Sequence, residues 1–476
     1  MTARPPYLTA LAETDPARLA LYCERDGFWT DYGTLAREVE TASRTFRHPR
    51  RQLAFLLFSN TRSDIAAYLG LLDAGHVPAL IDPHLDDELL ERLIAVYRPS
   101  FLLGSRAVRA NESWRPLQGA STLCWSAQGG GEDGDIHPGL GLLLTTSGST
   151  GSPKMARLST AALAHNCGAI IKALGIGPGE RAYLHLPLHY SYGLSVLHTH
   201  LAAGASVVLT ERTMIEAEFW DLAREQGCTS LPGTPHHYRM LDRLGLGALD
   251  MPAIKVLTQA GGRLDPVLAT RMHALMSGRG GRFYVMYGQT EAAPRITTLD
   301  HDAFAAHPGS VGRPLADGRI DILDTEGGLL PAGKTGQVVY RGPNVMMGYA
   351  ETLDDLAQGD VMGGVLPTGD LGHLDADGFL YLTGRANRFA KISGFRINLD
   401  EVEALAGPNR RVAAIENAGI IQLFAEGLTG DESKDLRRTL TRKLRLSSSA
   451  VTVTVLDALP VKESGKTDYA RLREQA

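Results

Sequence analysis

Short runs of consecutive apolar residues alternate with helical segments in the first part of the chain, and no other feature limits its fold as strongly. Leu53–Phe58 is one such run, and helical periodicity over Ser63–Ala74 and a second run over Val77–Ile81 follow it. Arg92–Tyr97 and Phe101–Leu103 repeat this order. Strands that are apolar throughout are typical of parallel sheets covered on both faces by helices. The sequence therefore predicts an α/β fold with stacked βαβ sheets.

Further elements are predicted on both sides of this region. They are a helix over Thr160–Leu174 and strands over Arg181–Leu188, Ala205–Leu209, Ala253–Thr258 and Phe283–Met286. Residues 15–47 have helical periodicity, in which Leu19, Leu21 and Tyr22 precede a turn at Asp26-Gly27. We therefore expect this segment to be helical.

Short strands separated by glycines begin near Gly309, with Gly336–Arg341 and Gly378–Leu382 as examples. This pattern predicts a small β-barrel-like or twisted-sheet subdomain over about residues 309–386. The segment 388–476 has strand and helix signals of its own. Because a chain of 476 residues is too long for one ordinary core, we expect a large N-terminal domain over 1–386 and a small α+β domain over 388–476.

Composition and charge exclude several classes of function. The net charge of −5 indicates no basic surface for nucleic acid. No run of about 18 apolar residues is present to span a membrane, and no apolar signal core follows the first residues. Four cysteines without metal-binding spacing suggest a reducing compartment. We therefore expect a cytoplasmic protein that does not bind nucleic acid, either a monomer or a homodimer.

The segment Leu142–Lys154 carries the strongest chemical signal in the chain. Its apolar start indicates a buried strand, and Thr146–Lys154 follows with small, hydroxylated and glycine residues and a final lysine. Glycines and hydroxyl groups let backbone N–H groups approach an anion, and the lysine adds a positive charge. The segment lacks the glycine-lysine-serine/threonine ending of the P-loop. It is therefore either a phosphate-binding loop of another kind or a flexible linker.

Four further motifs follow this loop. They are Gly261-Gly262, Tyr287-Gly288-Gln289-Thr290-Glu291, Pro367-Thr368-Gly369-Asp370-Leu371 with Gly384-Arg385, and Leu459-Pro460-Val461-Lys462-Glu463-Ser464-Gly465-Lys466. Together with the loop they resemble the adenylate-forming superfamily of acyl-CoA synthetases, stand-alone and modular adenylation domains, and luciferases. The resemblance covers nearly the whole chain, from Trp29 to Lys466. Met155 departs from the family pattern, in which a glycine usually follows the loop lysine.

The resemblance implies an ATP site and a magnesium ligand in these motifs. The loop residues implied to hold the β- and γ-phosphates of ATP are Thr146, Ser147, Gly148, Ser149, Thr150, Gly151 and Lys154. The other implied contacts are adenine with Gly261, Gly262, Tyr287 and Gly288, the α-phosphate with Thr290, Mg²⁺ with Glu291, the ribose with Asp370, and the ribose or a phosphate with Arg385. A carboxylate suits Mg²⁺, which prefers oxygen ligands.

The same resemblance implies a mobile C-terminal domain that carries the catalytic lysine. Asn387 occupies the hinge position, where the family usually has aspartate or lysine, and asparagine tolerates unusual backbone angles. Lys466 matches the catalytic lysine, although a lysine in a charged tail is by default a solvated one. Gly394 is implied to line the path of the thiol after the domain rotates.

By the same resemblance, the acid is expected to bind near His185–Gly193 and the segment near Gly233–Tyr238. Acyl- and aryl-activating relatives tend to have Leu-Pro-x-x-His-x-x-Gly here, and this chain has its histidine one residue early. Either His189 or Tyr190 is therefore the candidate gate beside the carboxylate, with Ser191 and Gly193 as further substrate contacts. No acidic residue occurs between Ala182 and Thr210 to pair with an α-ammonium group. An aryl or apolar acyl acid is therefore favoured over an α-amino acid.

The implied reaction is an ATP-dependent ligation of a carboxylic acid. The acid would form an acyl adenylate with release of pyrophosphate, and the acyl group would pass to a thiol, with release of AMP. The thiol is either that of CoA or the phosphopantetheine of a separate carrier protein, because the chain has no carrier domain. The alternatives are an amide-forming ligase that passes the adenylate to an amine, a non-catalytic binding protein that kept the fold, and an ATPase.

Overall fold

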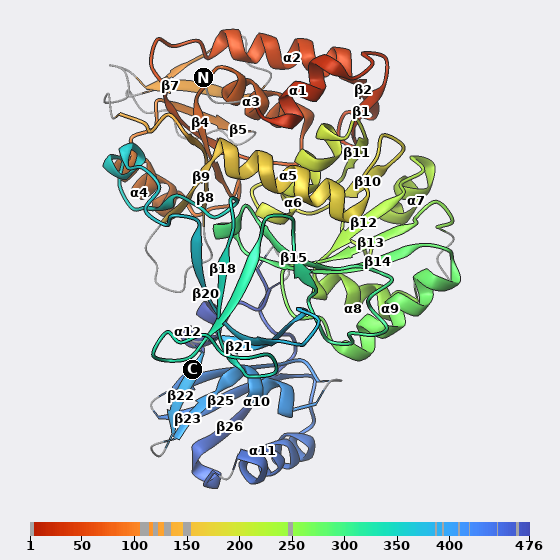
Figure 1. The fold of residues 1–476 in the computed structure, drawn as a ribbon, viewed down its shortest axis with the longest axis vertical. Coiled ribbons are helices and arrows are strands. Elements are labelled where there is room, and N and C mark those ends of the chain that lie inside the picture. The colour runs from red at the N-terminus through yellow and green to blue at the C-terminus, as the bar shows by residue number, and fades with distance from the viewer. Residues whose placement is uncertain are drawn as a thin grey trace.

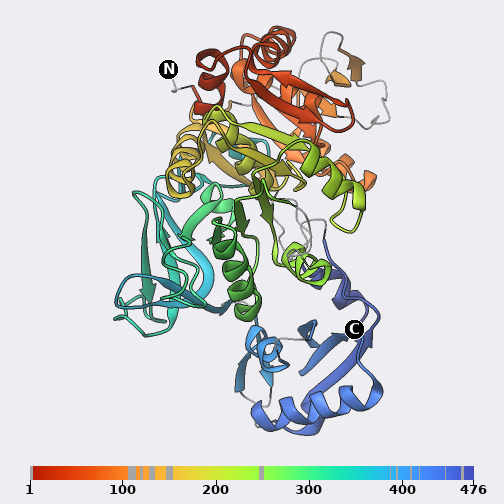
Figure 2. The same ribbon diagram turned by 90° about the vertical axis from the view of Figure 1, so that its right-hand side faces the viewer.

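The computed structural model describes residues 4–104, 114–117, 122–127, 135–145, 154–245, 251–385, 388–392, 395–407, 410–417, 419–444, 446–462 and 466–476. Two large sheets lie side by side in the upper part of Figure 1, and a smaller sheet and the C-terminal segment lie below them. Figure 2 shows the C-terminal segment at one end of the molecule.

The first large sheet is formed by segments that are far apart in the sequence. Its strands, in spatial order among the described residues, are β16 (Arg313–Pro314), β15 (Arg295–Leu299), β14 (Arg282–Gly288), β13 (Val256–Gln259), β12 (Ser230–Gly233), β10 (Arg181–Leu184), β11 (Ser206–Leu209), β1 (Leu19–Cys23) and β2 (Phe28–Asp31). The strands from β14 to β1 pair in parallel, and the outer strands are antiparallel. The predicted parallel sheet is therefore present.

The second large sheet holds the strand that enters the predicted phosphate loop. Its described strands, in order, are β19 (Gly348–Ala350), β9 (Met155–Ser159), β8 (Leu140–Thr145), β4 (Val77–Ile81), β3 (Leu53–Leu57), β5 (Phe101–Gly104), β7 (Cys124–Ala127) and β6 (Trp114–Pro116). All residues of β3 and β4 are buried, as their unbroken apolar sequences predict. These two strands pair in parallel.

Helices cover both sheets and fill the space between them. They are α1 (Pro6–Glu13), α2 (Tyr32–Thr45), α3 (Arg62–Asp73), α4 (Asp87–Tyr97), α5 (Thr160–Leu174), α6 (Ser191–Ala202), α7 (Ala217–Glu225), α8 (Pro235–Leu244) and α9 (Pro266–Gly278). Apolar residues of α3, α5 and α6 share the largest core with strands of both sheets. Ser191–Leu201 of α6 are all buried, so α6 is a central helix.

The prediction of helix over residues 15–47 is wrong for its first part. Leu19–Cys23 form strand β1, which pairs in parallel with β11 and forms a hairpin with β2. The hairpin turn includes Gly27, whose φ of 75° favours glycine. A run of five residues is too short for periodicity to separate helix from strand, and here the pairing with β11 stabilises the strand. The second part does form a helix, α2.

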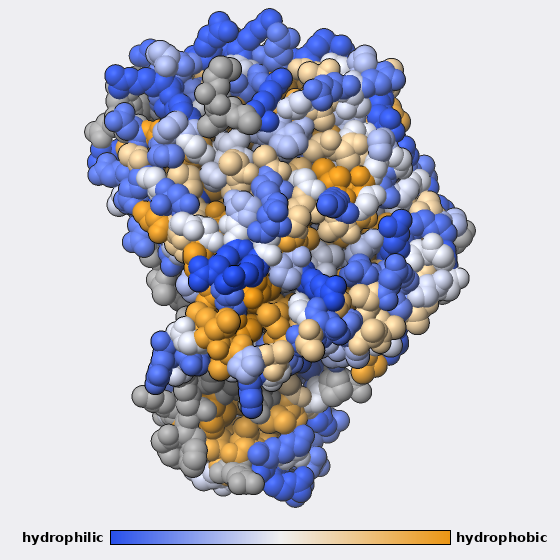
Figure 3. Space-filling view, in the orientation of Figure 1, coloured by the Kyte–Doolittle hydropathy of each residue, from blue (hydrophilic) through white to orange (hydrophobic). Residues whose placement is uncertain are grey.

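A four-stranded antiparallel sheet corresponds to the predicted small β-rich subdomain. Its described strands are β17 (Arg319–Leu323), β18 (Gly336–Arg341), β20 (Val365–Leu374) and β21 (Leu380–Arg385). Two strands within the range 309–386 pair elsewhere, because β16 and β19 extend the two large sheets. In Figure 3 polar side chains cover much of the visible face, and an apolar patch lies over this smaller sheet.

The C-terminal segment has its own sheets and core. The described elements are β22 (Phe389–Ile392), β23 (Phe395–Asn398), α10 (Leu399–Leu405), β24 (Val412–Asn417), β25 (Ile420–Glu426), α11 (Gly430–Leu444), β26 (Val451–Leu456) and α12 (Tyr469–Glu474). Their buried apolar residues form clusters separate from those of the preceding 385 residues. The predicted α/β fold with an α+β C-terminal region is confirmed. Within the described part of the chain, no helix has the length and apolarity needed to cross a membrane.

Candidate active site

The predicted phosphate loop connects two neighbouring strands of the second sheet. Residues 146–153 lie outside the described residues, and Thr146, Ser147, Gly148, Ser149, Thr150 and Gly151 are among them. Strands β8 and β9 on either side of this loop are antiparallel neighbours, and Thr145 pairs with Met155. The loop therefore leaves and re-enters the sheet at one point, with Lys154 at its return. Met155, the departure from the family pattern, is fully buried as the first residue of β9.

Lys154 and Glu291 are linked through a tyrosine that the sequence analysis did not identify. The ammonium nitrogen of Lys154 lies 4.1 Å from the centre of the Tyr349 ring. The Tyr349 hydroxyl donates a hydrogen bond to Glu291 Oε1 at 2.7 Å. Burial and the nearby Glu291 carboxylate raise the pKa of Tyr349, so this hydroxyl remains a donor. The predicted phosphate lysine therefore lies over the face of Tyr349, and the predicted magnesium ligand accepts from the hydroxyl of the same tyrosine.

Arg157 holds the segment that carries Tyr349. This arginine is fully buried in β9, three residues after Lys154. Its guanidinium donates to four backbone carbonyls, those of Tyr349 at 3.2 Å, Gln358 at 2.5 Å, Met347 at 3.1 Å and Gly359 at 3.3 Å. Its own carbonyl accepts from the Met347 N–H at 2.7 Å. The residues around β19 are thus fixed to the strand that follows the predicted phosphate loop.

A second group joins the tyrosine of the Tyr-Gly-x-Thr-Glu motif to the Thr-Gly-Asp motif. The Tyr287 hydroxyl donates to Asp370 Oδ2 at 2.5 Å, and Arg385 Nε lies 3.1 Å from Asp370 Oδ1. Asp370 and Arg385 are register partners in β20 and β21. Burial raises the pKa of Asp370, while Arg385 and the Tyr287 hydroxyl oppose that rise. Each oxygen of this buried carboxylate is therefore oriented by one donor and keeps a further lone pair that can accept a hydrogen bond from a hydroxyl.

Lys466 approaches this site from the C-terminal segment. Its ammonium nitrogen lies 5.6 Å from the centre of the Tyr190 ring. Burial, together with the positive charges of Arg385 and Lys462, lowers the pKa of Lys466 to about 8, while Glu291 and Asp370 oppose the shift. Lys466 therefore lies within electrostatic reach of the predicted magnesium ligand and of the predicted ribose ligand. It is therefore not an exposed tail residue.

The start of helix α6 faces the same region. Tyr190 is the residue before the helix, and its side chain accepts no hydrogen bond from the first N–H groups of α6. Ser191 Oγ lies 3.3 Å from Thr290 Oγ1. His189 Nε2 is 3.9 Å from Asp82 Oδ2, whereas Lys466 lies over the ring of Tyr190. Of the two candidate gates, Tyr190 is therefore the one beside Lys466.

Close backbone packing explains two of the predicted site glycines. A Cβ atom at Gly288 would lie 1.9 Å from the Pro294 carbonyl oxygen, and one at Gly193 would lie 2.3 Å from the Pro187 carbonyl oxygen. Gly261 has a φ of 89°, and a Cβ there would lie 2.6 Å from the Tyr190 hydroxyl. The Gly262 carbonyl accepts from Gln259 Nε2 at 2.9 Å. Gly261 thus permits the close approach of the tyrosine beside Lys466.

The structure brings together most of the predicted site residues that it describes. One connected region contains Lys154, Glu291, Asp370, Arg385, Tyr287, Thr290, Tyr190, Ser191 and Lys466. Asn387 and Gly394 lie outside the described residues. Sequence reasoning missed Tyr349 and Arg157, because their roles depend on the pairing of β19 with β9. An arginine inside the apolar strand Met155–Ser159 is the one signal that points to Arg157.

The donor set is suited to a nucleotide and a hard cation. Glu291 presents a carboxylate one of whose oxygens is held by Tyr349, and carboxylate oxygen is the ligand that Mg²⁺ prefers. Lys154 and Lys466 supply positive charge, and Asp370 supplies an oriented acceptor. Such a set can hold the phosphates of a nucleotide together with a cation, and compensates negative charge where a phosphate would lie.

Comparisons with known proteins agree with this class. Residues 8–350 match the family model described as AMP-binding enzyme. A sulfoacetate–CoA ligase from Cupriavidus necator is 31% identical over 292 residues, 60% of this chain and 54% of the relative. An L-proline–[L-prolyl-carrier protein] ligase from Streptomyces coelicolor is 28% identical over 355 residues, 71% of this chain and 66% of the relative.

A solved structure supports the fold over the whole chain. The o-succinylbenzoate CoA synthetase from Bacillus subtilis, in complex with its acyl-adenylate intermediate, has a TM-score of 0.77 and 22% identity, and 98% of this chain and 97% of that chain are covered. The chain belongs to the AMP-binding enzyme family, which confirms the predicted membership of the adenylate-forming superfamily. The match to the Cupriavidus ligase spans about half of that relative, 54%.

Proposed function

We propose that this protein is an ATP-dependent carboxylic acid ligase that forms an acyl adenylate and passes the acyl group to a thiol. One observation carries the proposal. Lys466, near the C-terminus, is half-buried, with its ammonium nitrogen 5.6 Å from the centre of the Tyr190 ring, and lies within electrostatic reach of Glu291, Asp370 and Arg385. A nucleotide-binding protein without acyl chemistry has no need of a lysine at that point. The relatives that act as CoA ligases or carrier-protein ligases support the same reaction class.

In the proposed reaction the acid carboxylate attacks the α-phosphorus of ATP. The new bond joins a carboxylate oxygen to phosphorus, and the bond to the β-phosphate oxygen breaks, so that pyrophosphate leaves with the electron pair. Two anions must meet for this step, and the protein has to compensate their charge. In this proposal Lys466 contacts both the carboxylate and the α-phosphate. The uncapped start of α6 adds partial positive charge for a carboxylate beside Tyr190.

The other site residues have supporting roles in this proposal. Lys154 and the loop residues 146–153 would hold the outer phosphates, Thr290 the α-phosphate, and Tyr287 with Gly261 and Gly262 the adenine. Asp370, oriented by Tyr287 and Arg385, would accept the ribose hydroxyls. Mg²⁺, when bound by Glu291, supplies further positive charge to the phosphates.

The second half-reaction transfers the acyl group to a thiol. We propose that the segment 388–476 rotates about the hinge position Asn387 and withdraws Lys466, so that a thiol enters past Gly394. CoA and the phosphopantetheine of a separate carrier protein are both candidate acceptors, since relatives of each type are known. A cytoplasmic location fits the four cysteines, which are free and buried. A monomer and a homodimer are both compatible with the proposal.

A screen for acid-dependent pyrophosphate exchange tests this function. Purified protein, ATP, Mg²⁺ and labelled pyrophosphate are incubated with aryl, aliphatic and dicarboxylic acids and with amino acids. We expect label to enter ATP only in the presence of an acid, and a thioester to form when CoA or a carrier protein is added. Release of ADP without acid would indicate an ATPase. Product with a simple amine but with neither thiol would favour the amide-forming alternative.

The rate of pyrophosphate exchange is expected to fall as the pH rises through about 8. Burial disfavours the charged form of Lys466 and lowers its pKa to about 8. The ammonium is therefore charged below that pH and neutral above it, and only the charged form compensates the two anions. The check is log(kcat/KM) for the acid against pH, which reports the free enzyme. Lys466→Arg should remove the alkaline fall, and a fall of the same midpoint in this variant would contradict the assignment.

A further inference from the structure

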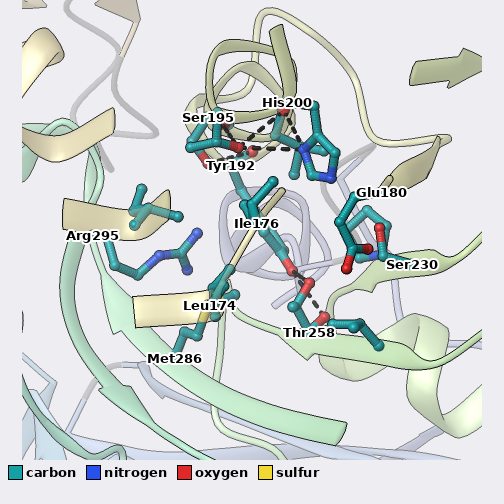
Figure 4. Close-up of a pocket in the computed structure, with 15 residues that line it drawn as sticks. Leu174, Ile176, Glu180, Tyr192, Ser195, His200, Ser230, Thr258, Met286 and Arg295 are labelled. Carbon is teal, nitrogen blue, oxygen red and sulfur yellow. Dashed lines mark hydrogen bonds between the residues drawn. The ribbon is translucent and has the colours of Figure 1, made fainter. Parts of the chain in front are cut away.

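A cavity between helices α5 and α6 and the first sheet contains a buried arginine. Figure 4 shows Arg295, from the start of β15, on one side of this cavity, with Leu174, Ile176 and Met286 among the apolar residues that line it. Its polar lining includes Tyr192 and Thr258, whose hydroxyls are hydrogen-bonded to each other at 2.8 Å. The cavity volume is about 30 Å³, enough for roughly one or two water molecules.

The guanidinium of Arg295 forms no ion pair with any of the described residues. The side chain is 3% exposed, and its Nε is buried without a hydrogen-bond partner. The guanidinium carbon lies 4.9 Å from the centre of the Tyr192 ring, and burial lowers the pKa of Arg295. The backbone is held firmly, because Asn166 bonds both the N–H and the carbonyl of Arg295, at 3.2 and 2.8 Å. A rigid backbone therefore directs an unpaired cation into the cavity.

A buried cation without a partner is unfavourable unless something in the cavity pairs with it. The ring of Tyr192 offsets only a part of the cost. Glu180 also lines the cavity, but Figure 4 shows it on the side opposite Arg295. Its carboxylate accepts from Thr229 Oγ1 at 2.9 Å. Glu180 therefore leaves Arg295 without an ion-pair partner, and an oxyanion in the cavity would supply one.

Two tyrosines connect this cavity with the proposed site of adenylate formation. Lys466 Nζ lies 5.6 Å from the Tyr190 ring, the rings of Tyr190 and Tyr192 are 6.4 Å apart, and Arg295 lies 4.9 Å from the Tyr192 ring. Both tyrosines also act electrostatically on Arg295. Two aromatic side chains therefore lie between the catalytic lysine and the buried arginine, and the body of an organic acid could pack along them.

We propose that the acid substrate carries a second oxyanion, a carboxylate or a sulfonate, which pairs with Arg295 while its reacting carboxylate lies beside Lys466. This inference rests on the proposed function and names the substrate class of that site. A guanidinium binds such groups through two parallel hydrogen bonds. The proposal changes the substrate class predicted from the sequence, an aryl or apolar acid, in one respect. The body of the acid lies along Tyr190 and Tyr192 as that prediction allows, but the far end of the acid is charged.

Pyrophosphate exchange with matched pairs of acids tests the proposal. Each pair consists of an aliphatic or aromatic dicarboxylic acid and its monomethyl ester, and sulfocarboxylic acids of the same lengths form a further series. Wild-type protein is expected to have a kcat/KM at least 100-fold higher for the best diacid or sulfo acid than for the matched ester. Arg295→Met should abolish this preference and keep or improve activity with the ester, and Arg295→Lys should restore part of it. The carboxylate and sulfonate series separate the two oxyanions.

The controls separate a specificity role from a structural one. Glu180→Gln should keep the wild-type preference, because this side chain lies on the opposite side of the cavity. Arg295→Met should melt at a temperature no lower than wild type, since it removes an unpaired buried charge. Equal loss of activity with diacid and ester, or a wild-type preference for esters and monoacids, would overturn the inference and leave the proposed function intact. No exchange with any acid, together with no thermal stabilisation by diacids, would overturn both.

Discussion

Lys466→Ala is expected to lower acid-dependent pyrophosphate exchange by about 10²–10³-fold, the usual effect of removing one charge-stabilising donor from a transition state. Transfer of the acyl group from a supplied acyl adenylate to a thiol should stay close to wild type. The reason is that Lys466 compensates charge only while the carboxylate meets the α-phosphorus. In the second half-reaction the proposed rotation has already withdrawn it. The two half-reactions are measured separately, with labelled pyrophosphate and with synthetic acyl adenylate.

Lys462→Ala is the matched control for this experiment. Lys462 lies four residues before Lys466, and its backbone N–H donates to the Lys466 carbonyl at 2.8 Å, a contact that the substitution keeps. Its charge lowers the pKa of Lys466. Lys462→Ala should therefore raise the pH at which the exchange rate falls and leave the rate at lower pH unchanged. Equal loss of both half-reactions in Lys466→Ala would contradict the role given to this lysine.

Arg157→Met is expected to lower the free energy of unfolding by about 3 kcal/mol, because four buried carbonyl groups lose a charged donor. The affinity for ATP should fall as well. Arg157 fixes the segment of Tyr349, and Tyr349 orients Glu291 and lies against Lys154. Chemical denaturation followed by tryptophan fluorescence gives the stability, and the KM for ATP in pyrophosphate exchange gives the second effect.

An arginine on the surface of the smaller sheet provides the comparison for Arg157. Arg319 is ion-paired with Asp321, but its side chain is 70% exposed, and exposed pairs contribute about 0–1 kcal/mol. Arg319→Met should therefore change stability and the KM for ATP very little. If Arg157→Met unfolded at the same denaturant concentration as Arg319→Met, the carbonyl contacts of Arg157 would not be the support that we describe.

The fold was predictable where local sequence and tertiary structure agree. Leu53–Leu57 and Val77–Ile81 are strands because their unbroken apolar sequences suit burial on both faces, and Thr160–Leu174 is a helix over the predicted range. Leu19–Cys23 was mispredicted, because its partner β11 lies more than 180 residues away at Ser206–Leu209. A five-residue apolar run contains no local information about such a partner.

The site was predictable only where a motif carries its chemistry in consecutive residues. Glu291 and Asp370 stand in such motifs, and the structure places them in one region. Tyr349 and Arg295 belong to no motif in this sequence, and their positions follow from packing. The pairing of β19 with β9 brings Tyr349 close to Lys154. Gly288 packs closely on Pro294, and the next residue, Arg295, begins β15 and points into the cavity. For Arg295, the one local sign in the sequence is a charged residue at the start of a buried strand.

Arg385 has contacts on both sides of the junction between the two parts of the molecule. Its guanidinium binds Asp370, and its backbone N–H donates to Asp400 Oδ2 at 2.8 Å. A ligand that engages Asp370 therefore acts on the same residue that an altered orientation of the C-terminal segment would disturb. If nucleotide binding changes the equilibrium between two orientations of the C-terminal segment by some factor, thermodynamic linkage requires that the nucleotide affinities of the two orientations differ by the same factor. We accordingly expect the affinity for AMP to change with the position of the C-terminal segment, so that product release is coupled to the proposed domain rotation.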